Sequence, residues 1–326
     1  MKAIVVTPGE PAPRLSWESV PDVTPGADEV LVDVKATAVN RADLLQARGL
    51  YPPPTGVTEV MGLEMSGVVR ALGPGVRGWV PGDAVMALLP GGGYAEAVAV
   101  HAGLLMRLPS GWSFHQGAAV PEVWLTAFLN LFLEGRLERG GRVLVHAGAS
   151  GVGTAAIQLA REAGATVFTT AGSPAKLEAC RRLGAAAAID YRSRDFAAEI
   201  KAATGGRGVD LVLDPVGASY LKRNLEVLAV GGRLVTIGLM GGARAELDIG
   251  VLIGKSLRLI GSRLRPKPTA EKIEITRRFG ERFLPLLASG KLQPVIDRVF
   301  PITAAAAAHE HVKENRNIGK VVLEIA

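Results

Sequence analysis

The segment from Arg142 to Ala160 combines residue types that could bind a nucleotide. A short apolar run, 142–147, leads into a loop of small residues and then into a stretch with helical spacing, 154–163. Glycine in such a loop lets the backbone turn sharply and approach a pyrophosphate. The free N–H groups at the start of the following helix point at the anion, where the helix dipole favours negative charge. The pattern predicts a phosphate-binding turn of a dinucleotide site, formed by Gly148, Ala149, Ser150, Gly151, Val152 and Gly153.

The loop departs from the G-x-G-x-x-G pattern at its central position. When the pattern is aligned on Gly148 and Gly153, Ser150 stands where the second glycine belongs. Its hydroxyl can donate to a phosphate oxygen, so the substitution is compatible with the predicted function. A glycine pattern alone is weak support for dinucleotide binding, but here the required strand precedes it and the required helix follows it.

The end of the next predicted strand, 166–170, indicates which dinucleotide is bound. An NAD enzyme places an acidic residue about 20 residues after the glycine loop, on the ribose 2′-hydroxyl. This chain has Gly172 and Ser173 there, and no acid that would repel a 2′-phosphate. Ser173 heads a predicted helix, Lys176 lies one turn into it, and Tyr191 follows the third strand. We therefore expect NADPH rather than NADH, with the 2′-phosphate at Ser173, Lys176 and Tyr191.

A second group of polar residues lies in the N-terminal part of the chain. Asn40 could be the N-cap of a short helix, with Asp43 as its third residue and Gly49 at its end, and this explains both polar residues without any function. Asn40 could instead donate to a substrate. Tyr51 precedes three prolines that hold the backbone extended. Its ring could merely pack, or it could stack on a flat substrate and donate its O–H.

Composition narrows the classes of function. The chain of 326 residues has a net charge of +6 but no dense basic block with interleaved aromatic residues, which argues against nucleic acid as a partner. The single cysteine, Cys180, excludes an internal disulfide and a multi-cysteine zinc site, and we interpret it as a packed thiol. No apolar run is long enough to cross a bilayer, and 1–8 is a strand broken by proline rather than a signal peptide. We therefore expect a cytoplasmic protein.

The elements that must position these residues follow an α/β rhythm after residue 142. Alternating strands and helices predict one doubly wound parallel sheet, in a dinucleotide-binding domain over 119–264. The predicted strands are 142–147, 166–170, 186–189, 209–213, 233–238 and 257–261, and the predicted helices are 154–163, 174–183, 195–203 and 219–230. Ligands of such sheets bind at the carboxyl ends of the strands. The segments 214–217 and 237–242 are such ends, which makes Val216 and Gly217 candidates for cofactor contact.

The N-terminal part lacks this rhythm. Short apolar runs between glycine and proline turns predict a mostly-β module, a partly closed barrel, over 1–118. These runs are 3–6, 29–36, 67–71, 84–87 and 95–100. The chain is expected to return to this domain over 265–326, with a long helix at 269–289, a strand at 295–300, a helix at 303–314 and a last strand at 319–325.

Several motifs resemble the medium-chain dehydrogenase/reductase family, and within it the zinc-free NADPH:quinone oxidoreductases of the zeta-crystallin-like branch. The motifs are Asn40-Arg-Ala-Asp43 with Tyr51-Pro-Pro, Gly62-Leu-Glu-Met-Ser-Gly67, Met86-Ala-Leu-Leu-Pro-Gly-Gly-Gly93, Pro121-Glu-Val-Trp-Leu-Thr126 and His146-Ala-Gly-Ala-Ser-Gly-Val-Gly-Thr-Ala-Ala156. The resemblance covers essentially the whole chain. It implies a GroES-like fold for the β module and a Rossmann fold for the α/β domain.

The resemblance also implies site residues and a missing metal. Thr126, Leu239, Met240, Leu264 and Asn317 would contact the cofactor, although Asn317 taken alone reads as a turn residue. Zinc-dependent members carry a metal-binding cysteine near Asn40 and Gly-His-Glu where this chain has Gly62-Leu63-Glu64. They also carry a four-cysteine lobe in the region of 88–94. With Leu63 and no cysteine in either place, we expect no metal site, and Glu64 should instead make a structural hydrogen bond or ion pair.

These features lead to the hypothesis of a metal-free reduction of quinones by NADPH. The cofactor would lie in the cleft between the two domains, and hydride would pass from the nicotinamide to a substrate ring stacked against Tyr51. Charge on the substrate oxygen would be met by Asn40, Tyr51 or water. One alternative uses the same hydride step to reduce the C=C bond of an enal or enone. Another alternative is a protein of a different functional class, a binding protein or nucleic-acid binder. The strand at 257–261 would be a sheet edge, where the family commonly dimerises, so a homodimer is expected.

Overall fold

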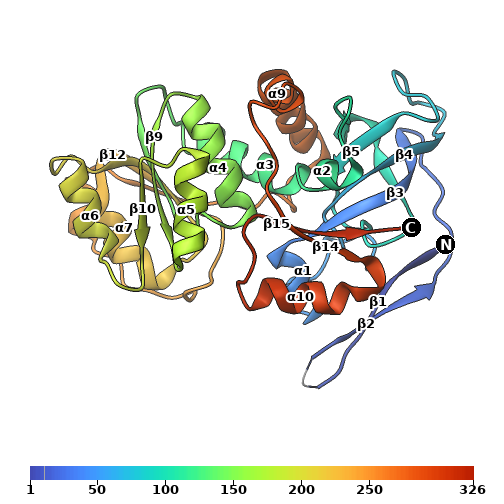
Figure 1. The fold of residues 1–326 in the computed structure, drawn as a ribbon, viewed down its shortest axis with the longest axis horizontal. Helices are drawn as coiled ribbons and strands as arrows, with labels where there is room; N and C mark the ends of the chain where they lie inside the picture. Colours follow the sequence, from blue (N-terminus) through green and yellow to red (C-terminus); the bar gives the residue numbers. More distant parts are fainter. Residues whose placement is uncertain (11) are drawn as a thin grey trace. The chain divides into compact units, whose positions relative to one another are not determined.

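The computed structural model describes residues 1–10 and 12–326. The chain forms two compact units (Figure 1). The first unit contains residues 1–125 and 265–326, and the second unit contains residues 126–264. Helix α3, Pro121–Phe128, contains the boundary between them, and a π-helical turn, Leu129–Glu134, continues it.

The second unit is built on a six-stranded parallel sheet, as the α/β rhythm predicts. Its strand order is β10-β9-β8-β11-β12-β13, the order of a doubly wound dinucleotide-binding fold. The strand order reverses between β8 and β11, so the carboxyl ends of these two strands flank the position where such folds bind their ligand. The strands are β8 (Arg142–Val145), β9 (Thr166–Ala171), β10 (Ala187–Asp190), β11 (Val209–Asp214), β12 (Leu228–Thr236) and β13 (Arg258–Gly261).

The segments that connect successive strands form helices, and these helices pack against the sheet. Helices α4 and α5 pack against β8, β9 and β10, while α6 and α7 pack against each other and against β10 and β12. Apolar side chains such as Phe168, Ile200 and Leu234 fill the layer that includes α6 and α7. The helices are α4 (Gly151–Glu162), α5 (Pro174–Leu183), α6 (Phe196–Ala203), α7 (Leu221–Val227) and α8 (Ile249–Gly254), with a 3-10 turn at Ala218–Tyr220.

Two details of the second unit differ from the sequence expectation. The helix predicted over 219–230 ends at Val227, and β12 starts at Leu228 instead of at residue 233. Leu228 pairs with Val209 of β11, so tertiary strand pairing decides a segment that local pattern assigned to the helix. Helix α8 was not predicted, although Asp248 is a good N-cap and its Oδ1 accepts from the N–H of Val251 at 3.0 Å.

The first unit contains the expected mostly-β module. Its larger sheet has the order β14-β15-β3-β4-β5-β7, with β6 also paired to β3, and β1 and β2 form a separate hairpin. The strands are β1 (Lys2–Thr7), β2 (Arg14–Ser19), β3 (Glu29–Val39), β4 (Glu64–Leu72), β5 (Ala84–Leu88), β6 (Ala97–His101), β7 (Leu105–Arg107), β14 (Ile296–Pro301) and β15 (Lys320–Glu324). Strand β2 was missed, although Leu15 and Trp17 alternate with polar residues and pack on the core.

The helices of the first unit close its core. They are α1 (Arg41–Ala47), α2 (Phe114–Ala118), α9 (Thr269–Ala288) and α10 (Ala305–Lys313), with 3-10 turns at Ala102–Leu104 and Ile302–Ala304. Met61, Met65, Val85 and Tyr94 are fully buried in the main apolar cluster. The short helix α2 and strand β7 were not predicted from sequence. The pairing of β15 with β3 joins the C-terminal segment to the N-terminal strands, as the sequence led us to expect.

Candidate cofactor and substrate sites

The predicted phosphate-binding turn connects β8 to α4 at the reversal of strand order. The chain leaves the sheet through Ala147, whose φ of 53° is left-handed, and the N–H of Gly148 donates to the carbonyl of Thr170 at 2.9 Å. Ser150 is the N-cap of α4, and its Oγ accepts from the N–H of Gly153 at 3.0 Å. The turn therefore presents the N-terminus of a twelve-residue helix, which is the arrangement that binds a pyrophosphate.

The two outer glycines of the turn are needed for close packing rather than for an unusual backbone. A Cβ on Gly148 would lie 1.9 Å from Oγ1 of Thr169, and a Cβ on Gly153 would lie 2.4 Å from the carbonyl oxygen of Ala147. Neither glycine has a positive φ, because the sharp bend is made by Ala147. The sequence argument placed the bend in the glycines, so this part of it was wrong. These two glycines therefore let the turn and the start of α4 pack closely on the end of the sheet.

The residues expected to hold a 2′-phosphate come together beyond the end of β9. Ser173 caps α5, with its Oγ accepting from the N–H of Lys176 at 3.4 Å. The phenol of Tyr191 lies over Gly172, where an added Cβ would be 2.5 Å from Oη. Tyr191 is exposed and Lys176 is half-buried. Ser173 and Lys176 thus lie in the first turn of α5 and the Tyr191 hydroxyl lies against Gly172 just before it, at a helix N-terminus where an anion is favoured.

Two loops at the carboxyl ends of β11 and β12 are locked together. The N–H of Gly241 donates to the carbonyl of Val216 at 2.7 Å, and the N–H of Met240 donates to that of Pro215 at 3.3 Å. Gly217 has a φ of 84° and packs so closely on the second loop that a Cβ would lie 2.9 Å from the carbonyl of Gly242. The structure therefore brings Val216 and Gly217 next to the segment that contains Leu239 and Met240.

The other predicted cofactor residues have varied surroundings. Leu239 and Met240 are 60% and 50% exposed, which leaves an apolar surface at this end of the sheet. Thr126 and Leu264 are buried in the second unit. Asn317 belongs to the first unit, and its side chain donates to the carbonyl of Gly319 at 2.7 Å, as a turn residue does. Cofactor contact by these residues stays a prediction.

A buried polar network fixes the carboxyl ends of β8 and β11. Asn224 Nδ2 donates to Asp214 Oδ2 at 3.0 Å, so Asn224 Oδ1 must accept from Nε2 of His146, 2.8 Å away. Nδ1 of His146 then accepts from the hydroxyl of Thr170 at 2.9 Å. Asp214 Oδ1 in turn accepts from the N–H of Val216 at 2.7 Å. The network therefore holds the turn after β11 in place.

Burial shifts the pKa values in this network in opposite directions. It lowers the pKa of His146 to about 4, because the charged imidazolium would lose its hydration. It raises the pKa of Asp214 to about 6, against the backbone and side-chain hydrogen bonds that favour the carboxylate. At neutral pH the network therefore holds a neutral imidazole and an ionised carboxylate.

The first unit contains a buried ion pair where the zinc-dependent pattern would have its metal ligands. Lys320 donates to Glu64 Oε1 at 2.8 Å, to Asn40 Oδ1 at 2.6 Å and to the carbonyl of Val39 at 3.0 Å. Glu64 is fully buried and its other oxygen accepts from the N–H of Glu122 at 2.9 Å. The expectation that Glu64 makes a structural ion pair is confirmed.

This cluster also defines the surroundings of Asn40. Asn40 precedes α1, and its N–H donates to Asp43 Oδ2 at 2.7 Å as part of the expected capping box. The side-chain amide instead donates to Glu64 Oε1 at 2.8 Å and to the carbonyl of Ala38 at 3.3 Å. Both amide hydrogens that could meet a substrate oxygen therefore have acceptors within the protein.

Asp43 links this cluster to two further buried groups. Its pKa is raised to about 6 by burial, although the N–H of Asn40 and the charge of Lys320 favour the carboxylate. The hydroxyl of Tyr94 lies 3.4 Å from Asp43 Oδ2 and 3.1 Å from Nε2 of His309. Burial lowers the pKa of His309 to about 4, so its ring is neutral at neutral pH.

Tyr51 lies against a cation that the sequence analysis did not find. The guanidinium of Arg265 is 5.3 Å from the centre of the Tyr51 ring, within the range of a cation–π contact. Arg265 and its neighbour Lys272 are 6% and 5% exposed. Nothing in the sequence around Arg265 distinguishes it from a surface arginine. Its burial and its contact with Tyr51 could therefore not be predicted from the sequence.

The residues at the metal positions have little capacity to bind zinc. Leu63 is buried and apolar, and Glu64 is already neutralised by Lys320. Among residues 1–10 and 12–326, no group of three or more His, Cys, Asp and Glu side chains is arranged to hold a metal ion. Cys180 is free and fully buried, and burial raises the pKa of its thiol to about 11, which confirms the packed, unreactive thiol. Within the same described part of the chain, no helix is long and apolar enough to cross a membrane.

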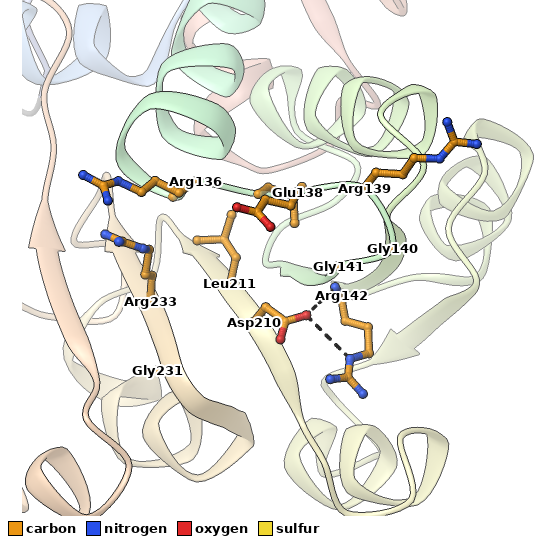
Figure 2. A pocket seen from close by; sticks show the side chains of 12 residues that line it. Arg136, Glu138, Arg139, Gly140, Gly141, Arg142, Asp210, Leu211, Gly231 and Arg233 are labelled. Carbon is orange, nitrogen blue, oxygen red and sulfur yellow. Dashed lines mark hydrogen bonds and ion pairs between the residues drawn. The ribbon is translucent and has the colours of Figure 1, made fainter.

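A pocket of about 420 Å³ lies in the second unit at the opposite end of the strands (Figure 2). Asp210 accepts from the N–H of Arg142 at 2.7 Å and pairs with its Nε at 3.6 Å. Arg136 and Arg233 lie at the other side of the pocket. Because Arg142 starts β8 whereas the phosphate-binding turn follows its end, this pocket is distinct from the predicted dinucleotide site.

The His146 network predicts how acid affects the second unit. The imidazole has its usual pKa of 6.5 in the unfolded chain and about 4 when folded, so acidification from pH 7 to 5 costs about 2 kcal/mol of stability. Asp214, whose folded pKa is raised to about 6, opposes this with a gain of about 1 kcal/mol over the same range. His146→Gln should therefore make the second unit more stable at pH 5 than at pH 7. Hydrogen exchange of residues 142–261 at both pH values, corrected for intrinsic rates, measures this. A variant that loses stability on acidification as wild type does would contradict it.

Comparison with known proteins agrees with this architecture. Residues 26–110 match the alcohol dehydrogenase GroES-like domain, and residues 151–278 match the zinc-binding dehydrogenase family. The chain belongs to the medium-chain dehydrogenase/reductase family. That family consists of oxidoreductases with nicotinamide cofactors, and the fold of this chain is the expected GroES-like module with a Rossmann-type sheet.

Solved structures of similar chains carry several descriptions. An NAD-dependent alcohol dehydrogenase is 34% identical with a TM-score of 0.88, and each chain is covered completely. CurK enoyl reductase is 32% identical with a TM-score of 0.85, over 96% of this chain and 95% of that one. Quinone oxidoreductase of Escherichia coli, solved with NADPH, is 30% identical with a TM-score of 0.86, over 95% and 96%.

Much longer proteins also contain a similar segment. The polyketide synthase component PikAII of Streptomyces venezuelae is 36% identical over 99% of this chain. The chain spans only 8% of the length of that protein. The matching segment is therefore a small part of a much longer protein.

Proposed function

We propose that the protein is a metal-free, NADPH-dependent reductase of C=C bonds conjugated to a carbonyl group, such as those of enones and enoyl thioesters. The buried Lys320–Glu64 ion pair supports a metal-free site. The Lys320 ammonium already neutralises the carboxylate at the position where a metal ligand would be needed. The similarity to CurK enoyl reductase and to polyketide synthases favours the C=C bond over the quinone that the sequence suggested.

The cradle at the carboxyl ends of β8 and β11 fits the cofactor. The turn from Gly148 to Gly153 would receive the pyrophosphate, and Ser173, Lys176 and Tyr191 would receive the 2′-phosphate. When bound, the reduced nicotinamide supplies a hydride. The chain itself binds and orients the reactants and excludes water, and no side chain is required as a strong acid or base.

The first unit supplies the groups that face the substrate. The ring of Tyr51, 5.3 Å from the guanidinium of Arg265, would contact the flat face of the substrate. Asn40, with both amide hydrogens occupied, has a positioning role: it joins Lys320, Glu64 and the start of α1 into one rigid cluster. This assignment replaces direct donation by Asn40 to the substrate.

Quinone reduction is the second candidate. The similarity to a quinone oxidoreductase solved with NADPH favours it, and a quinone needs only the same hydride step. An enone differs because its product must be protonated at carbon. Turnover of the two substrate classes therefore separates the candidates.

The experiment follows NADPH oxidation optically with 2-cyclohexen-1-one, a crotonyl thioester, 1,4-benzoquinone and 9,10-phenanthrenequinone, with and without a chelator. Higher kcat/KM for the enone or thioester, unchanged by chelation, supports the proposal. Turnover of quinones alone would move the assignment to the second candidate. Loss of activity after chelation would overturn the metal-free assignment.

The cofactor preference gives a separate prediction. Lys176→Met should raise KM for NADPH by about tenfold, because one charge-assisted contact to a phosphate contributes about 1.4 kcal/mol. KM for NADH should change little, since it has no 2′-phosphate. Steady-state kinetics with both cofactors measure the effect. Equal loss with NADPH and NADH, or equal use of the two by wild type, would contradict the assignment of Ser173, Lys176 and Tyr191.

Homodimer formation through β13 is part of the proposal. The strand lies at the edge of its sheet, and Leu259 on it and Ile253 on α8 are 39% and 72% exposed. An unpaired edge with exposed apolar side chains favours pairing with a second copy. Light scattering of wild type and Leu259→Lys tests this.

A further inference from the structure

Arg265 has an unusual environment for a charged side chain. It is 6% exposed, and its Nε donates to the carbonyl of Pro90 at 2.8 Å. Its two terminal nitrogens, Nη1 and Nη2, are buried and have no hydrogen-bond partner among the residues that the structure describes. The guanidinium thus keeps a set of N–H donors in a protected place without an acceptor.

Leaving such donors unpaired is costly for the folded protein. A buried polar group without a partner costs about 1–3 kcal/mol, and a charged group more. Burial accordingly lowers the pKa of Arg265. Groups of this kind persist where a ligand provides the missing acceptor. The acceptor expected here is an oxygen atom, because a guanidinium donates and cannot accept.

The surroundings of Arg265 offset part of its charge and provide a flat apolar surface beside it. Asp43, Glu59 and Glu122 lie close enough for their carboxylates to act on the charge of Arg265. They offset that charge, although Lys272 adds a second cation beside it by donating to the carbonyl of Arg265 at 3.4 Å. The Tyr51 ring on the guanidinium provides a flat apolar surface. A planar, uncharged molecule with a carbonyl oxygen fits these groups.

We propose that Arg265 binds the carbonyl oxygen of the substrate through Nη1 and Nη2 and holds the negative charge that grows on it. The inference rests on the proposed function and names Arg265 as its oxyanion-stabilising residue. When a hydride from the reduced nicotinamide adds to the β-carbon, the C=C electron pair moves to the α-carbon–carbonyl bond and the carbonyl pair moves to oxygen. An enolate results, and a proton from water at the α-carbon completes the reduction. Donors aimed at the oxygen stabilise the enolate more than the ketone.

The test compares Arg265→Met with Arg107→Met. Arg107 also lies over an aromatic ring, 4.7 Å from that of Trp79, and also donates to a backbone carbonyl, that of Gly78 at 3.0 Å. It differs because Nη1 already pairs with Asp83 at 3.0 Å. With 2-cyclohexen-1-one, kcat/KM should fall by about a hundredfold in Arg265→Met and by less than about twofold in Arg107→Met. The dissociation constant for NADPH should not change in either variant.

Ligand binding provides a readout that does not depend on turnover. The probe is 4-nitrophenolate, whose ring carries an anionic oxygen as an enolate does, and the matched neutral compound is nitrobenzene. Quenching of tryptophan fluorescence follows both, because Trp17, Trp79, Trp112 and Trp124 all belong to the first unit. Arg265→Met should weaken phenolate binding by about tenfold and leave nitrobenzene binding unchanged.

The outcomes distinguish this inference from the proposed function. If wild type reduces enones and Arg265→Met keeps kcat/KM within about threefold, the role of Arg265 is wrong and the function stands. If Arg265→Met weakens the binding of 4-nitrophenolate and of nitrobenzene equally, the role of Arg265 is structural. If wild type reduces neither enones nor quinones, the proposed function fails, while selective loss of the phenolate would still establish Arg265 as an oxygen-binding group.

Discussion

Replacing Lys320 by methionine should destabilise the first unit by about 3–5 kcal/mol, since the change leaves a buried carboxylate without its counter-charge. Glu64 is fully buried and Lys320 is 3% exposed, so water cannot replace the lost ammonium. The substitution also removes the three hydrogen bonds that the Lys320 ammonium donates, to Val39, Asn40 and Glu64. Urea unfolding followed by tryptophan fluorescence measures the effect in the correct unit, because all four tryptophans lie there.

A double variant controls for the loss of packing. Lys320→Met combined with Glu64→Gln removes both charges and keeps the acceptor for the N–H of Glu122 and the size of the side chain. It should recover at least about half of the stability lost in the single variant, because no unpaired charge remains buried. If Lys320→Met alone costs less than about 1 kcal/mol, the pair is not the electrostatic centre of the cluster.

The parts of the fold that follow from local pattern were predicted from sequence. The alternation of strands and helices after residue 142 is enough to predict a doubly wound sheet, because right-handed crossovers leave few topologies for it. Capping residues such as Ser173 and Asp195 act on neighbouring backbone groups, so their type and position show the helix starts directly.

Long-range pairing accounts for what was missed. Lys320 contacts Asn40 across 280 residues of sequence, and nothing near either residue indicates the other. Arg265 similarly meets the carbonyl of Pro90 and the ring of Tyr51 only through the fold. The sequence therefore marked Asn40 and Tyr51 as polar candidates but could not show that Asn40 is fully paired and that Arg265 is not. The predicted end of the helix before β12 was wrong for the same reason, since the pairing of Leu228 with Val209 is a tertiary contact.

The phosphate-binding turn carries the second large expected effect. Gly153→Ala should weaken NADPH binding by about a hundredfold, equivalent to roughly 3 kcal/mol, because the new Cβ cannot fit beside the turn. It would lie 2.4 Å from the carbonyl oxygen of Ala147 and 2.6 Å from that of Gly148. These are backbone atoms, so the start of α4 must move away from β8. The N–H groups offered to a pyrophosphate then lose their positions. Titration of NADPH emission measures the dissociation constant.

Gly254→Ala is the matched control for this change. Gly254 ends helix α8 in the same unit, and no atom lies within 4 Å of its added Cβ. The substitution should leave NADPH binding within about twofold of wild type, since alanine in a helix is at least as stable as glycine. The thermal midpoint of both variants separates loss of the site from loss of the fold. Gly153→Ala with a dissociation constant within about threefold of wild type would show that the dinucleotide does not depend on this turn, and the crevice at β8 and β11 would then need another occupant.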